Sequence, residues 1–84
     1  MRVYYTPMNE TTYQGWANYE TWNVALYLQN DYALYNLRKE FKNYADFERY
    51  VEMSYMREET PDGVRYDSAF LNHLELDTLF QKES

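Results

Sequence analysis

Residues 15–31 constrain the fold of this chain more than any other segment. Both tryptophans and a helix-start signal fall within these seventeen residues. Asn18 is a favourable N-cap, and a threonine three positions later gives a weak form of the capping box. From residue 19 to residue 29, apolar side chains cover most of the helix circumference, which is typical of a central helix. We therefore expect a helix here to organise the fold, ending where Asn30 adopts the left-handed conformation and Asp31 caps the next helix.

The spacing of apolar residues predicts three further helices. Residues 32–43 carry apolar side chains at helical spacing, with basic residues near their end, where a cation suits the helix dipole. A third helix is expected from Ala45 or Asp46 onward, with Phe and Tyr on one face and charged residues on the other. A fourth is expected to be capped by Asp67 or Ser68.

Turn signals and an arm complete the prediction. Residues 60–63 read Thr-Pro-Asp-Gly, which places proline and glycine where a β-turn favours them. Asp77 is the expected cap of a last short turn over residues 78–82. Residues 1–15 show no helical period, so we expect an extended N-terminal arm there.

These elements predict an all-α fold: one compact domain of about four short helices (residues 16–84), preceded by the arm and closed by a short C-terminal helical turn. The chain has 84 residues and no cysteine, so packing must supply its stability. Eleven Tyr, four Phe and two Trp provide the material, because each aromatic ring can bury a large area. We expect Trp22, Leu26 and Phe41 in the core.

The first helix and the residues beside it resemble a known group of proteins. The pattern aromatic-x-Asn-Tyr-Glu-Thr-Trp, followed by an apolar helix, Asn-Asp and Tyr, resembles small uncharacterised proteins of phages, plasmids and other mobile DNA. The match runs over Trp16, residues 18–22, Leu26 and residues 30–32. Residues 67–77 are similar to the end of that family, although this chain lacks the tryptophan found there. The resemblance implies a fold and a mobile-element setting, and it implies no activity or catalytic residue.

Targeting signals are absent from the sequence. No stretch approaches the ~18 consecutive apolar residues of a membrane span, and the N-terminus lacks the apolar core of a secretory signal. With no cysteine, this favours a cytoplasmic location, which for a mobile element means the host cell.

Catalytic chemistry is not indicated. His73 is the single histidine, and without cysteine the usual zinc ligand sets cannot form. Glu58, Glu59 and Asp62 flank a turn, but their spacing lacks the alternating oxygen ligands of a calcium loop. There is no Gly-rich phosphate loop or nucleophile motif. We expect no enzyme activity, no metal and no cofactor.

Charge is the strongest functional indication. Residues 44–84 hold four basic and ten acidic residues, so the net charge of -6 belongs to this half. Nucleic-acid binding requires basic surface, so a basic macromolecular partner, in particular a host protein, is favoured. Tyrosines in excess of what a small core can hide suit a binding surface. The predicted partner-binding residues are Tyr50, Tyr55, Glu58, Glu59, Asp62 and Tyr66.

Two interpretations remain open. The first is a protein-interaction module of a mobile element, such as an inhibitor of a host defence or nucleic-acid-handling protein. The alternative is a nucleic-acid-binding or regulatory module that uses Arg38, Lys39 and Lys42, interleaved with Tyr35 and Tyr44. The acidic half would then be only a solvated face. A structural role within a larger assembly is a third option.

Overall fold

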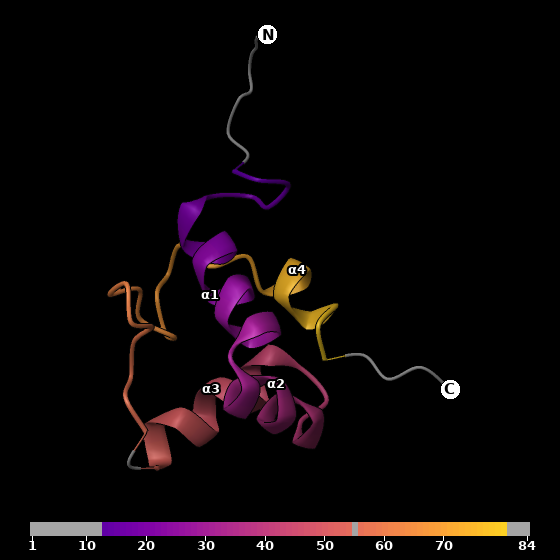
Figure 1. Cartoon of the computed structure of the whole chain (residues 1–84), viewed down its shortest axis with the longest axis vertical. Coiled ribbons are helices and arrows are strands. Elements are labelled where there is room, and N and C mark those ends of the chain that lie inside the picture. Colours follow the sequence, from indigo (N-terminus) through magenta and orange to yellow (C-terminus); the bar gives the residue numbers. More distant parts are fainter. Residues whose placement is uncertain (1–12, 55, 81–84) are drawn as a thin grey trace, which may run out of the picture.

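The computed structural model describes residues 13–54 and 56–80 and confirms an all-α fold. Four α-helices and one short 3-10 helix follow in the order α1 Tyr19–Asn30, α2 Tyr32–Leu37, η1 Arg38–Glu40, α3 Tyr44–Met53 and α4 His73–Asp77. In Figure 1, α1 runs through the middle, with α4 beside it and α2 and α3 at its C-terminal end. Within the described ranges, β-structure amounts to two isolated bridges, Tyr13 with Trp16 and Glu59 with Arg65.

The caps of α1 and α2 were predicted correctly. The Asn18 side chain accepts a hydrogen bond from the Thr21 backbone N–H at 2.8 Å, and the Asp31 carboxylate accepts one from Leu34 at 3.1 Å. The left-handed ending was wrong, because Asn30 is still helical and Asp31 is extended, with φ -83° and ψ 119°. One residue therefore ends α1 and caps α2, and the chain bends sharply there.

The boundaries of the second and third helices differ from the predicted ones. Residues 32–43 do not form one helix: α2 ends at Leu37, η1 follows, and Phe41 is extended. The Asn43 side chain accepts a hydrogen bond from the Asp46 N–H at 2.9 Å. This cap starts α3 at Tyr44, slightly before the predicted Ala45 or Asp46. The backbone of an N-cap residue is itself non-helical, with φ -156° and ψ 172° at Asn43, so a helix cannot run through this position.

The fourth helix also begins later than predicted. It starts at His73 with Asn72 as its cap, and neither Asp67 nor Ser68 caps a helix. The Ser68 hydroxyl instead accepts a hydrogen bond from the Phe70 N–H at 3.1 Å, while Asp67 pairs with Arg65. Such local side-chain bonds give the backbone an alternative to the helix.

Both predicted turns are present, with one change. Residues 60–63 form the expected turn: the Gly63 N–H donates to the Thr60 carbonyl at 2.8 Å, and Gly63 has the positive φ of 92° that favours glycine. Residues 78–80 make helical-type bonds to the preceding turn. Asp77 does not cap this turn, because it lies within α4 and its carboxylate accepts the Tyr44 N–H at 2.9 Å. Residues 81–82 of that predicted turn, and residues 1–12 of the arm, lie outside the described ranges.

The core is a single cluster built by all four α-helices, by residues 64–71 and by Phe80. Trp22, Leu26 and Phe41 were wrongly predicted to be buried in it, since each is partly exposed. Phe41 packs against the cluster from its edge. Trp22 instead contacts Tyr13 and Tyr19 at the start of α1, with ring centroids 5.0 and 5.7 Å away. The buried residues are Val24, Ala25, Leu28, Leu34, Tyr44, Phe47, Val51, Val64, Tyr66, Leu71, Leu76 and Phe80.

Polar side chains connect segments that are distant in sequence. The Glu75 carboxylate accepts the Ala17 N–H at 2.8 Å, and the Thr21 hydroxyl accepts the Asn72 N–H at 2.9 Å. Together with the bond from Tyr44 to Asp77, these contacts hold α4 against α1 and α3. Two of the acidic residues of the second half are thus acceptors for backbone groups.

Asn18 has a second role that leads to a testable prediction. Its amide also donates to the Phe70 carbonyl at 2.6 Å, which ties the start of α1 to the segment before α4. We expect Asn18→Ala to lower the free energy of unfolding by about 1–2 kcal/mol, through loss of both the cap and this bond. Asn18→Asp keeps the cap acceptor but loses the donor, so it should also destabilise the protein. Urea unfolding of both variants tests this; an unchanged midpoint for Asn18→Asp would mean that the bond to Phe70 contributes nothing.

Candidate protein-interaction surface

The three tyrosines predicted to contact a partner have different positions. Tyr50 is exposed on α3, with 42% of its surface accessible and its ring against Phe41 at 5.3 Å. Tyr66 is only 4% exposed and packs on Phe47, so its ring belongs to the core and was wrongly predicted to be a surface group. Burial raises the pKa of Tyr66 to about 12, so its hydroxyl stays neutral. Tyr55 lies outside the described residues.

The three predicted carboxylates do not form one group. Glu58 is exposed and pairs with Arg65 at 3.0 Å, whereas Glu59 is half-buried beside the backbone bridge to Arg65. Asp62 accepts hydrogen bonds from the Asn23 amide at 2.8 Å and from the Tyr27 hydroxyl at 3.1 Å. Asp62 therefore fastens the 60–63 turn to α1, in addition to any contact it makes with a partner.

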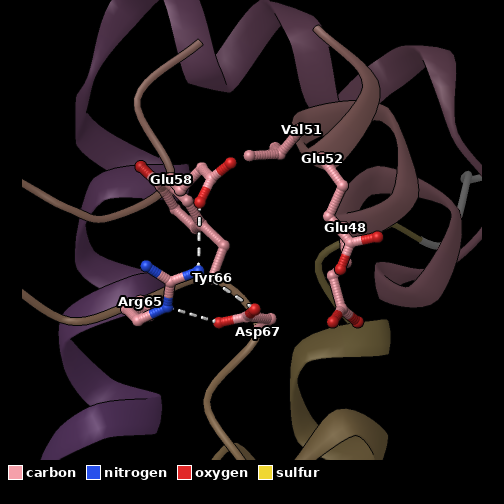
Figure 2. A pocket seen from close by; sticks show the side chains of 7 residues that line it. All are labelled: Glu48, Val51, Glu52, Glu58, Arg65, Tyr66 and Asp67. Atoms are coloured by element: carbon pink, nitrogen blue, oxygen red, sulfur yellow. Dashed lines mark hydrogen bonds and ion pairs between the residues drawn. The ribbon is translucent and has the colours of Figure 1, made fainter.

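A different set of carboxylates comes together in one hollow, which we call the acidic hollow (Figure 2). Glu48 and Glu52 reach it from α3, and Glu58 and Asp67 face them from the segment that follows. Among the described residues that line it, Arg65 is the one cation, and it lies between Glu58 and Asp67. The full lining is Glu48, Val51, Glu52, Glu58, Arg65, Tyr66 and Asp67.

The acidic hollow is shallow. Its volume is about 10 Å³, room for about one water molecule and far below the ~300–1,000 Å³ of small-molecule sites. Val51 and Tyr66 line it but are almost fully buried, so a partner's lysine or arginine would meet the exposed carboxylates at its rim with its charged end. No group of three or more His, Cys, Asp or Glu side chains in the described part of the chain is placed to hold a metal ion.

Electrostatics differ between the two sides of the acidic hollow. Burial raises the pKa of Glu48; nearby His73 lowers it, while the charges of Glu52 and Asp67 raise it further. The His73 ring nitrogen Nε2 lies 4.0 Å from a Glu48 oxygen. On the other side, the hydrogen bond from Arg65 lowers the pKa of Asp67, which therefore stays ionised to lower pH. Of these two carboxylates, Glu48 is therefore the one whose ionised form is disfavoured by the fold.

Glu48 gives a prediction about pH. Because folding raises its pKa, the folded protein holds this proton more tightly than the unfolded chain does. The ionised group therefore costs stability as the pH rises above the ordinary pKa of 4.5. We expect Glu48→Gln to be more stable than the wild type near pH 7 and to lose this advantage below about pH 4. Urea unfolding at both pH values tests this, with Glu52→Gln, exposed on the same helix, as the control. A less stable Glu48→Gln near pH 7 would mean that attraction to His73 outweighs burial.

The basic residues of the alternative interpretation are engaged within the fold. The Arg38 guanidinium donates to the Leu79 carbonyl, and it lies 4.7 Å from the centre of the Tyr35 ring. The Lys39 ammonium lies 4.6 Å from the centre of the same ring. Tyr44, predicted to interleave with these residues, is fully buried and contributes nothing to the surface. Lys42 remains exposed.

Of the predicted partner-binding residues, Asp62 lines a second hollow. It is open to solvent, has a volume of about 420 Å³, and has the rings of Tyr19 and Phe70 among its lining, so we call it the aromatic hollow. The full lining is Tyr19, Glu20, Asp62, Gly63, Val64, Arg65, Ser68 and Phe70. No periodicity brings residues 19, 63 and 70 together, so the only sequence signal was the high tyrosine content.

Comparison with known proteins identifies one family. The profile of a Family of unknown function (DUF7249) matches residues 9–84, which is most of the chain. No curated protein and no solved structure matches it. Evidence about function therefore comes from the geometry and charge of the surface.

Proposed function

We propose that this chain, which belongs to the DUF7249 family of unknown function, is a small acidic module that binds a basic surface of a partner protein. The observation that carries the proposal is the acidic hollow, which is lined by four carboxylates from two segments and by one arginine. Arg65 is already paired with Glu58 and Asp67. Glu48 and Glu52 therefore leave an excess of negative charge, which a lysine or arginine of a partner would neutralise.

The same charge arrangement favours a protein over a nucleic acid as the partner. Phosphates would be repelled by the carboxylates of the acidic hollow, and binding them requires several basic side chains on one surface. Arg38 and Lys39 both contact the Tyr35 ring, and Arg38 also fastens the C-terminal turn. A basic protein surface would instead be attracted from a distance, and this attraction would weaken with added salt.

The biological setting is part of the proposal. The resemblance to proteins of phages, plasmids and other mobile DNA supports an inhibitor that acts inside the host cell on a defence or nucleic-acid-handling protein. Proteins that handle nucleic acids carry basic clefts, which match an acidic surface electrostatically. None of the helices in the described ranges is long and apolar enough to cross a bilayer.

Affinity capture from host lysate, with and without nuclease, tests the proposal. We expect wild-type protein to retain a partner after nuclease treatment, and Glu52→Lys to retain roughly tenfold less or weaker still, as for loss of a central charged contact. Glu40→Lys is the matched control, because Glu40 is also an exposed carboxylate but lies in η1, outside the acidic hollow. Charge reversal of Asp62 is a poor test, since its bonds to Asn23 and Tyr27 would be lost with the charge.

The nucleic-acid alternative predicts a different pattern. Lys42→Glu would then abolish binding, Glu52→Lys would improve it, and nuclease would release the captured material. That combination would overturn the protein-interaction proposal.

A further inference from the structure

The aromatic hollow and the acidic hollow share a wall. Arg65 lines both: its guanidinium is held by Glu58 and Asp67 on the acidic side, and the residue also borders the space beside Tyr19 and Phe70. A ligand lying across Arg65 could therefore contact both hollows at once.

The two rings of the aromatic hollow are both exposed. Phe70 is 70% exposed and Tyr19 39% exposed. An exposed phenylalanine ring gains much by contact with another ring, because aromatic pairs bury a large area and add about 0.5–1.5 kcal/mol through their preferred geometries. The volume of about 420 Å³ is ample for such a side chain.

The charges that line the aromatic hollow indicate which kind of molecule would supply the second ring. Glu20 and Asp62 line the aromatic hollow as anions, and the one cation in its described lining, Arg65, is neutralised by its two carboxylate partners. A nucleobase could stack on the rings, but its phosphates would meet carboxylates on both sides of Arg65. A protein segment that carries basic side chains next to an aromatic one fits both the rings and the charges.

We infer that the aromatic hollow binds an aromatic side chain of a partner segment whose neighbouring lysine or arginine meets the carboxylates at the rim of the acidic hollow, across Arg65. This inference rests on the proposed function and specifies the partner: an extended or turn segment with an aromatic residue close to a basic one. Aromatic anchors seated in pockets dominate the energetics of many protein interfaces, with charged contacts providing orientation.

Selection from a library of random peptides displayed on phage tests the inference on the whole protein. We expect peptides enriched on the wild type to combine an aromatic residue with nearby basic residues. The affinity of an enriched peptide should fall at least about tenfold for Phe70→Ser, because a central aromatic contact is lost. Leu74→Ser and Tyr32→Ser are the controls: these side chains are 81% and 83% exposed but lie outside the aromatic hollow. Circular dichroism establishes that each variant is folded.

Glu52→Lys separates the charge from the ring, because Glu52 lines the acidic hollow and not the aromatic hollow. It should weaken the preference for basic residues beside the aromatic one while the aromatic preference itself remains. Enriched peptides that are basic but contain no aromatic residue would overturn the inference and leave the proposed function standing. Acidic peptides, no enrichment at all, or displacement of the peptides by single-stranded poly(U) RNA would overturn both. Equal affinity of Phe70→Ser and the wild type would exclude the aromatic hollow as the site.

Discussion

Phe47→Ala should lower the free energy of unfolding by about 3–5 kcal/mol, as deletion of a fully buried ring does in other small domains. Phe47 is completely buried, and its ring contacts those of Phe41, Tyr44, Tyr66 and Phe80 at centroid distances of 5.6–6.0 Å. The free energy of unfolding of a small domain is only about 5–15 kcal/mol in total, so much of the stability would be lost. Urea unfolding followed by circular dichroism measures this.

The control for Phe47 is Met53→Ala on the same helix. Met53 is 80% exposed, so its truncation should change the free energy of unfolding by no more than about 0.5 kcal/mol. Similar midpoints for the two variants would mean that α3 does not present Phe47 to the core, and the packing described above would be wrong.

Asn23→Ala should lower the free energy of unfolding by about 2–4 kcal/mol, nearly as much as Phe47→Ala, because it leaves buried polar groups without partners. Asn23 and Thr60 are both fully buried, and the Thr60 hydroxyl donates to the Asn23 side-chain oxygen at 2.6 Å. The Asn23 amide in turn donates to Asp62 at 2.8 Å. Thermal unfolding of Asn23→Ala compared with Asn36→Ala, an exposed asparagine on α2, tests this; Asn36→Ala should be close to the wild type.

A double variant distinguishes the hydrogen bond from simple loss of volume. If the bond matters, Asn23→Ala combined with Thr60→Val should cost less than the sum of the two single changes, since the second change removes the unsatisfied hydroxyl. Additive costs would show that the two side chains do not depend on each other.

Features that depend on neighbouring residues could be predicted from the sequence. The cap at Asn18, the cap at Asp31 and the turn at residues 60–63 were correct, because each needs only side chains and backbone a few positions apart. The all-α class followed from the same local patterns together with the absence of alternating strands. These features require no knowledge of the tertiary fold.

Features that depend on which segments meet could not be predicted. The first helix is apolar nearly all round, so its pattern alone does not distinguish Val24 and Leu28 from Trp22 and Leu26 as its buried side. The missed start of the fourth helix has a similar cause, because the Phe70 carbonyl is held by an asparagine 52 positions away.

The candidate site was predicted at the level of charge and missed at the level of residues. The acidic second half does contribute the acidic hollow, and Glu58 belongs to it. Glu48, Glu52 and Asp67 were not singled out, because α3 approaches the 58–67 segment only in the folded protein. Tyr66 was misassigned because a tyrosine count cannot tell which rings the core requires.

The bond from Ala17 to Glu75 bears on how the protein is made. These residues are 58 positions apart, and Thr21 and Asn72, which also bond, are 51 apart. At ~5–20 residues per second, a ribosome needs about 3–12 s to proceed from Ala17 to Glu75. During that interval α1 has emerged while the partners of its N-terminal turn do not yet exist. The part of its surface that α4 covers therefore stays open until α4 emerges, and the domain cannot complete its fold before then.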